Sequence, residues 1–372
     1  MTIAASTTPV NTSWSRCVAT FTNVPVMLDD YQTDNVDFGR TLNPWSASHS
    51  PGGSSGGAAA AIATGLSFGD LGSDLYGSIR MPAAWCGIYG HRPSNGVLSK
   101  LGHMPWTHGS RMEPPLSTVG PLAATASDLE LVFRVLADAP VRAPDGASPG
   151  AQMKIGLWLD DDVAPISSSY RAALEEFADR LRGWGATVET IESAPVAGES
   201  GLDLFDRLMG AELSHNYAPG IARELAALAA GGSAGMAWAR FLDQSSSSVW
   251  QAWEEQREIT AAWSRLFENY DLVVAPAAHG AAPLWDPLPP EERTLMMEGR
   301  PWPAVHLASA WSRLTNVGMG PATVVPIGLD ELGLPLGAQV LGPNFADAQT
   351  LSAASRWERD GVIARPSLTA WP

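Results

Sequence analysis

The chain has 372 residues, of which 45% are hydrophobic and 17% charged, a composition typical of a globular protein and not of a disordered one. Its formal net charge of −16 argues against a nucleic-acid partner, which needs a basic surface. No apolar run is long enough to span a membrane, the first residues lack the apolar core of a secretory signal, and two cysteines fit neither a disulfide framework nor a zinc ribbon. We therefore expect a cytoplasmic protein without metal or cofactor.

The first 45 residues show little that identifies a structure. Residues 1–17 have no clear periodicity, and the segment from Val18 leads into Asn43-Pro44-Trp45. Taken alone, an Asn-Pro pair indicates an ordinary turn.

The stretch from Pro51 to Cys86 organises the chain. It opens with Gly-Gly-Ser-Ser-Gly-Gly at 52–57, continues through the helix-forming run 58–66 and a strand-like segment 67–74, and turns at 75–78. The glycine-rich hexapeptide by itself is typical of a flexible linker. Its position before an apolar helix, with a second serine in a glycine-containing turn downstream, indicates instead a loop at a helix N-terminus. The unpaired N–H groups of that terminus and of the turn could bind a negative oxygen.

Buried strands and amphipathic helices follow in alternation. The expected elements are a helix 127–136 capped by Ser127, a surface loop 140–150, a strand 153–159, a helix 168–184 ended by Gly185, and a strand 188–191. In the helix 168–184 the apolar residues recur every three or four positions, which is the helical period. The strand–helix–strand order predicts a parallel pair with a right-handed crossover.

The second half of the chain is predicted to close the fold. We expect mostly helix over 202–263 with breaks at 231–235 and 245–248, then a strand 272–275, a loop 281–300, a helix 307–317, strands 321–326 and 334–341, and a terminal helix 345–359. Four aromatic residues could face a substrate or pack between helices: Trp238, Phe241, Trp250 and Trp253. We expect His215 and His279 to be structural, since neither has a carboxylate partner in its pattern.

The organising stretch, PGGSSGGAAAAIATGLSFGDLGSDLYGSIRMPAAWC, resembles the signature of the amidase signature family. That family uses a serine nucleophile, a second serine after a cis peptide bond, and a lysine. The resemblance assigns the nucleophile to Ser78, the cis-serine to Ser54, loop support to Ser55, and the oxyanion-binding amides to Leu75, Tyr76, Gly77 and Ser78. Tyr76 is a departure, since many members carry glycine there. A tyrosine would be strained at that position if the backbone needed a positive φ.

Further segments extend the resemblance over about 18–365. They are Gly87–Ser94, Val119–Leu129 and the closing segment that contains Gln339. The implied fold is an α/β protein, an α/β/α sandwich with a mixed central sheet flanked by helices, missing its N-terminal part. We expect an amidase domain over 18–366 and an unmatched segment over 1–17. The implied reaction is hydrolysis of the C–N bond of a small carboxylic amide through an acyl-enzyme.

The catalytic lysine is missing from the matching positions. The chain has two lysines, Lys100 and Lys154, and both follow Ser78, whereas the family's lysine precedes the Gly/Ser loop. The family's structural lysine is also absent from Thr20-Phe21-Thr22-Asn23. We therefore expect a chain truncated at its N-terminus, with very low activity and exposed apolar surface.

Three functions remain open on the sequence. The first is an amidase for a small-molecule amide, and the second is a catalytically dead remnant or binding protein that keeps the pocket. The third is the amidase-type subunit of a tRNA-dependent amidotransferase, against which the acidic charge and two lysines argue. The assembly is open, and a homodimer is one candidate.

Overall fold

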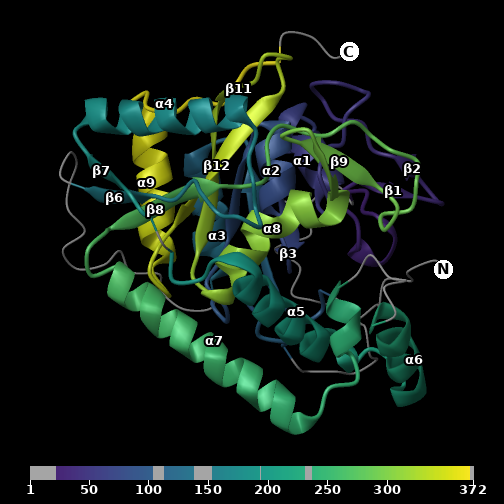
Figure 1. Cartoon of the computed structure of the whole chain (residues 1–372). Coiled ribbons are helices and arrows are strands. Elements are labelled where there is room, and N and C mark those ends of the chain that lie inside the picture. Colours follow the sequence, from purple (N-terminus) through teal and green to yellow (C-terminus); the bar gives the residue numbers. More distant parts are fainter. Residues whose placement is uncertain (1–21, 104–112, 138–152, 193, 231–236, 369–372) are drawn as a thin grey trace.

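An eight-stranded mixed sheet forms the centre of the computed structural model, which describes residues 22–103, 113–137, 153–192, 194–230 and 237–368 (Figure 1). The strands lie in the order β3 (Gly69–Asp74), β5 (Thr118–Ala123), β4 (Tyr89–Arg92), β11 (Ala322–Leu329), β12 (Pro335–Leu341), β8 (Leu272–Pro276), β6 (Lys154–Leu157) and β7 (Thr187–Thr190). Strand β6 pairs in parallel with β7 and β8, and the other neighbours are antiparallel.

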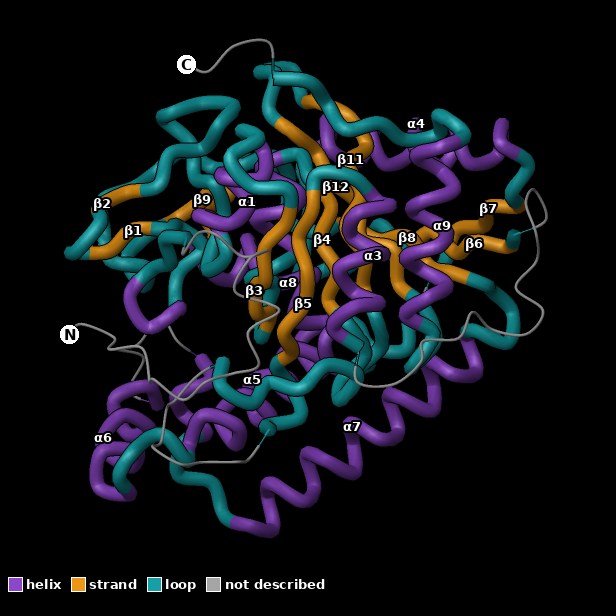
Figure 2. The backbone as a smooth tube through the Cα atoms, turned by 180° about the vertical axis from the view of Figure 1, so that it is seen from behind, coloured by secondary structure: helices purple, strands orange, loops and turns teal. Residues whose placement is uncertain are grey.

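Helices cover both faces of this sheet. One face carries α1 (Gly56–Ala63), α2 (Arg80–Cys86) and α8 (Ala304–Val317), and the other carries α3 (Ala126–Leu136), α4 (Ser168–Trp184) and α9 (Asp347–Arg359). Figure 2 shows α3 and α9 in front of the strands, with α8 behind them. The predicted α/β class, with a mixed sheet between helical layers, is thereby confirmed.

A helical group packs beside α8, away from α1 and α2. It consists of α5 (Gly198–Ser214), α6 (Pro219–Ala230), the short η2 (Ala237–Phe241) and the long α7 (Ser246–Leu266). The remaining elements are the short η1 (Val26–Leu28) and two hairpins, β1 (Asp34–Asn35) with β2 (Gly39–Arg40) and β9 (Thr294–Met297) with β10 (Arg300–Pro303).

The predicted helix over 168–184 is confirmed at both ends. The Ser167 side chain accepts a hydrogen bond from the Tyr170 N–H, and Gly185 ends the helix with φ of 108°. Strands β6 and β7 flank α4 and pair in parallel, as the strand–helix–strand order predicts.

Several boundaries differ from the sequence-based expectations. Helix α3 is capped by Thr125, whose side chain accepts from the Asp128 N–H, so Ser127 is inside the helix and not its N-cap. The predicted loop over 281–300 contains β9 and the start of β10. The polar hairpin turn Glu298-Gly299 makes the short strands on either side of it hard to recognise from the sequence. Helix α1 ends at Ala63 because the chain turns at Gly65, where φ is 76°. The expected loop 140–150 and the break at 231–235 lie outside the described residues.

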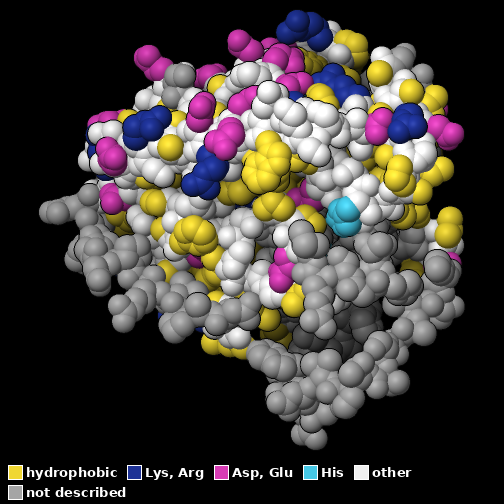
Figure 3. Space-filling model, turned by 90° about the horizontal axis from the view of Figure 1, so that it is seen from below, with side chains coloured by type: hydrophobic (Ala, Val, Ile, Leu, Met, Phe, Trp, Pro, Cys, Tyr) yellow, Lys and Arg dark blue, Asp and Glu magenta, His cyan; other side chains and the backbone are white. Residues whose placement is uncertain are grey.

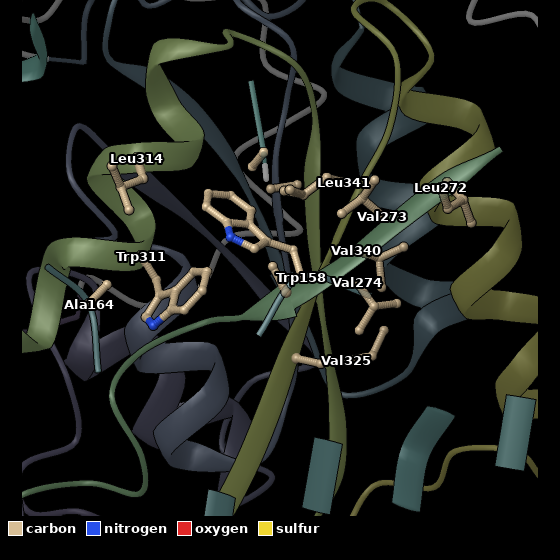
Figure 4. Packing of buried hydrophobic residues seen from close by; sticks show 14 of the residues in the cluster. Trp158, Ala164, Leu272, Val273, Val274, Trp311, Leu314, Val325, Val340 and Leu341 are labelled. Atoms are coloured by element: carbon tan, nitrogen blue, oxygen red, sulfur yellow. The ribbon is translucent and has the colours of Figure 1, made fainter. Parts of the chain in front are cut away.

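The core between the sheet and α8 is aromatic and aliphatic. The rings of Trp158 and Trp311 meet edge to face at 4.9 Å, and both side chains are fully buried. Figure 4 shows Val274 and Val340 on adjacent strands beside these rings. Burying such large rings supplies much of the apolar area that stabilises the domain.

The surface is mixed in character. On the face shown in Figure 3, acidic, basic and hydrophobic side chains are interspersed over the coloured atoms. Among the helices in the described ranges, none has the length and apolarity that crossing a membrane requires.

Candidate active site

The Gly/Ser loop lies at the N-terminus of α1 and is built for close backbone contacts. The peptide bond between Gly53 and Ser54 is cis. A β-carbon on Gly53 would lie 2.1 Å from the Asp30 carbonyl oxygen, so no larger residue fits there. Ser54 and Ser55 are consequently held in a buried loop, with exposed fractions of 2% and 5%.

The second loop, between β3 and α2, is fixed by a buried ion pair. The Asp74 carboxylate accepts hydrogen bonds from the Gly77 N–H at 2.9 Å and from Arg80 Nε and Nη2 at 2.9 and 2.8 Å. Burial by itself raises the pKa of the Asp74 carboxyl, but the charge and hydrogen bonds of Arg80 outweigh it and hold the pKa at about 2. The ion pair that fixes this loop therefore stays charged at neutral pH.

Arg80 ties this loop to α8 and β12. Its guanidinium also donates to Thr315 Oγ1 at 2.7 Å, Gln339 Oε1 at 3.0 Å and Asn316 Oδ1 at 2.6 Å. Gln339, which the closing segment singled out, thus supports the loop from the opposite end of the chain. Every donor of a planar guanidinium finds an acceptor here, which a buried cation requires.

Both predicted serines reach the same cavity. Ser54 and Ser78 line a cavity of about 320 Å³, and the Ser55 N–H donates to the Ser78 carbonyl at 3.2 Å across the two loops. Ser78 is 5% exposed. Within the described part of the chain, neither the Ser54 nor the Ser78 hydroxyl has a hydrogen-bond partner.

The amides of the second loop differ in what they contact. The Gly77 N–H is engaged by Asp74, whereas the N–H groups of Tyr76 and Ser78 have no acceptor among the described residues. In this loop Gly77 has a positive φ, at 115°, whereas the φ of Tyr76 is not positive. A tyrosine is therefore accommodated at position 76 without the strain considered from the sequence.

The two lysines have different surroundings. Lys154 lies on β6, half-exposed, and pairs with Glu189 at 3.1 Å. Lys100 lines the serine cavity, and its ammonium donates to the Ser117 carbonyl at 2.7 Å, to Ser117 Oγ at 3.0 Å and to the Pro114 carbonyl. Burial lowers the pKa of Lys100, and the charge of Glu212 opposes that shift.

Glu212 completes this wall of the cavity. Its carboxylate, on α5, accepts from the Leu116 N–H at 2.7 Å, from the Ser117 N–H at 3.2 Å and from the Ser117 hydroxyl. Lys100, Ser117 and Glu212 thus form one hydrogen-bonded chain. The ammonium of Lys100 therefore donates its hydrogen bonds within this wall and not to either serine hydroxyl.

Asp29 and Tyr76 form a second polar contact at the cavity. The Tyr76 hydroxyl donates to Asp29 Oδ1 at 2.6 Å. Burial raises the pKa of the Asp29 carboxyl to about 6, and the hydrogen bond from Tyr76 opposes that shift.

The aromatic and histidine residues that the sequence singled out lie in different environments. Trp238 lines the cavity, whereas Trp250 is 70% exposed. Phe241 lies against Gly210 of α5, and Trp253 is partly buried against the main hydrophobic core. His279 is buried edge-on against Trp85, and burial lowers its pKa to about 4. Neither His279 nor His215 lines the cavity, and their structural role stays a prediction.

Sequence reasoning missed several residues of the cavity wall. Asp29, His103 and Glu212 line it, and so does Lys100, which the sequence placed only as a lysine after Ser78. No local pattern marks these positions, because each reaches the site through a contact between distant segments. Among the described residues, no group of three His, Cys, Asp or Glu side chains could hold a metal ion.

This arrangement defines a class of protein, an α/β fold with two serines, one on a glycine-rich loop and one on a glycine-containing turn, that line one cavity. The family model described as Amidase matches residues 18–351. The chain therefore belongs to the amidase signature family, as the resemblance predicted. The matched bounds fall within the predicted domain of 18–366, whose limits stay a prediction.

Several proteins are similar to this chain in sequence or in structure. The chain is 28% identical to a subunit of glutamyl-tRNA(Gln) amidotransferase from Deinococcus radiodurans, over 89% of this chain and 72% of that protein. The structure of the identically named protein from Thermotoga maritima is similar with a TM-score of 0.72, at 24% identity, covering 94% of this chain and 76% of that one. A bacterial aryl acylamidase of the amidase signature enzymes is similar with a TM-score of 0.71, at 25% identity, covering 92% and 74%.

Proposed function

We propose that the chain hydrolyses the C–N bond of a small carboxylic amide, with Ser78 as nucleophile and Ser54 as proton relay. The observation that carries the proposal is that both serines line one cavity, next to two backbone N–H groups that have no acceptor among the described residues. Membership of the amidase signature family supports it.

The chemistry assigns each group a step. Ser78 Oγ forms a bond to the carbonyl carbon as its proton passes to Ser54, and Ser54 at the same time passes its own hydroxyl proton to the amide nitrogen. The tetrahedral oxyanion accepts hydrogen bonds from the N–H groups of Tyr76 and Ser78. Each such donor contributes roughly 3–4 kcal/mol to the stability of the transition state. The C–N bond then breaks, the amine leaves with a proton from Ser54, and water hydrolyses the Ser78 ester to release the acid.

Activation of Ser78 is the weak step of this scheme. A serine hydroxyl needs an adjacent base, and Lys100 donates its hydrogen bonds to Pro114 and Ser117 and not to Ser54 or Ser78. We therefore propose a slow hydrolase, because losing one member of a catalytic triad lowers the rate by about 10⁴-fold.

The proposal is tested by hydrolysis of acetanilide, followed by release of aniline. Replacing Ser78 with Ala removes the nucleophile, and we expect no release above the uncatalysed rate. Replacing Ser54 with Ala should lower the rate by about 10²-fold or more, since proton transfer is impaired. Ser73→Ala is the matched control, because Ser73 lines the same cavity but takes no part in the scheme. Aniline release that survives in Ser78→Ala would exclude Ser78 as the nucleophile.

The non-catalytic alternative makes a different prediction for the same samples. A binding protein with a dead site would bind anilides in calorimetry and release no aniline in any variant. That outcome would replace the hydrolase by a binding function of the same cavity.

A second candidate function is favoured by the names of the relatives. The chain is 28% identical to one component of an amidotransferase over 89% of its length. On this reading the chain acts only with partner subunits. The test is formation of amidated Glu-tRNA(Gln) when the chain is added to the other components of such an enzyme. Release of aniline by the chain alone would contradict the requirement for partners.

A further inference from the structure

A second cavity lies directly behind one wall of the serine cavity. It measures about 420 Å³ and is lined by Phe205, Val305, His306 and Arg313, among others. Four residues line both cavities and therefore separate them: Asp29, Tyr76, Met209 and Trp238. The two volumes are neighbours divided by side chains and not by the main sheet.

Tyr76 is the member of this wall that lies nearest to the nucleophile in the chain, two residues before Ser78. Its ring is 7% exposed and is held at both ends. The backbone end is fixed by the bond from the Gly77 N–H to Asp74, and the hydroxyl end by its 2.6 Å bond to Asp29. A side chain fixed at both ends forms a rigid stop for a ligand lying against Ser78.

The other wall residues come from the helical group. Met209 on α5 is 2% exposed, and Trp238 on η2 is 9% exposed. The second cavity holds apolar side chains, Phe205 and Val305, and the Arg313 guanidinium there pairs with Asp206. Since this ion pair neutralises the arginine, the space suits an uncharged chain better than an anionic one.

We propose that Tyr76, held by Asp29, determines the length of the amide substrate, and that the second cavity is the space a longer neutral chain occupies when this ring is removed. The proposal rests on the function assigned above to the serine cavity. It makes Tyr76 a specificity-determining residue through its side chain, independently of its backbone N–H.

The test measures binding, so that slow or absent hydrolysis does not affect it. All proteins carry Ser78→Ala, and acetanilide and octananilide are titrated in calorimetry. With Tyr76 present we expect at least tenfold weaker binding of octananilide than of acetanilide. In Tyr76→Ala this order should reverse, because the octanoyl chain can bury its apolar surface in the second cavity. Tyr76→Phe keeps the ring but loses its bond to Asp29, so the preference for the short amide should decrease without reversing.

A second variant of the same wall, Met209→Ala, is the control for a folding defect in Tyr76→Ala. Met209→Ala enlarges the junction from α5, so it should shift the preference in the same direction. A purely structural role of Tyr76 would weaken both anilides by the same factor. An unchanged ratio in Tyr76→Ala and Met209→Ala would overturn the inference alone. No binding of either anilide by any variant would overturn the proposed function as well.

Discussion

Asp29 and Asp74 are carboxylates near the same serine, yet their pKa values move in opposite directions. Asp74 is fully buried but faces the Arg80 guanidinium, and its pKa stays at about 2. Asp29 faces the neutral hydroxyl of Tyr76, and burial raises its pKa to about 6. The partner decides the outcome, because a cation compensates the lost hydration of a carboxylate and a phenol does so only in part.

The raised pKa of Asp29 predicts a pH-dependent contribution to stability. The folded state binds this proton more tightly than the unfolded state, whose pKa is 3.8, so the contribution decreases as pH rises from about 4 through about 6. Asp29→Asn removes the ionisation and keeps an oxygen for Tyr76. The mutant should therefore gain stability relative to the native chain as pH rises from about 4 through about 6, and it should keep that gain up to about pH 8.

Urea unfolding at the two ends of this pH range measures the difference. Asp37→Asn, an exposed position in the β1–β2 loop, is the matched control for loss of one charge. The account fails if Asp29→Asn changes the free energy of unfolding by the same amount at both pH values.

At the scale of an element, the turn between β3 and α2 positions the candidate nucleophile. Gly77 has φ of 115°, and a β-carbon there would lie 2.6 Å from Ser312 Oγ on α8. The turn therefore depends on glycine twice, once for its backbone conformation and once for its contact with α8. The Asp74–Arg80 pair then joins the turn to the same helix through Asn316.

Gly77→Ala should destabilise the protein more than a glycine replacement whose only cost is the backbone strain of an alanine at a positive φ. At Gly65, φ is 76° and nothing lies within 4 Å of the added carbon, so Gly65→Ala should cost about 1–2 kcal/mol. At Gly77 the contact with Ser312 should add roughly 1–3 kcal/mol. Equal losses in urea unfolding would show that α8 yields to the added carbon.

At the scale of the whole molecule, β3 is an edge of the described sheet and pairs there only with β5. Apolar side chains are exposed beside this edge, with Phe68 at 90%, Leu66 at 79% and Leu71 at 46%. An edge strand with exposed apolar residues can pair with another chain. This surface is where we expect self-association to begin.

Leu71→Lys should reduce self-association measured by light scattering, because a charge on an edge strand opposes pairing. Its free energy of unfolding should change by no more than about 0.5 kcal/mol, as for an exposed position. Leu332→Lys adds the same charge in the β11–β12 turn, at a side chain 77% exposed, and is the control. An equal effect of both variants would point to net charge and not to the edge.

Local sequence determined much of the framework. The helix α4 and its glycine stop, strands β6 and β8, and the strand over 69–74 follow from patterns within a few residues. The order of glycines and serines also located the two loops that meet at the cavity. Such features are predictable because caps, turns and periodic apolar faces are encoded over short distances.

Only the tertiary structure decided what surrounds the two serines. Lys100 reaches the cavity through Ser117, Glu212 reaches it from α5, and Asp29 meets Tyr76 across 47 positions of the chain. Burial and neighbouring side chains then set the pKa of Asp29. Packing also forms the wall, between the two cavities, in which Tyr76 lies. These properties come from contacts between segments far apart in sequence, so the signature identified the loops, and packing determined the space and the charge around them.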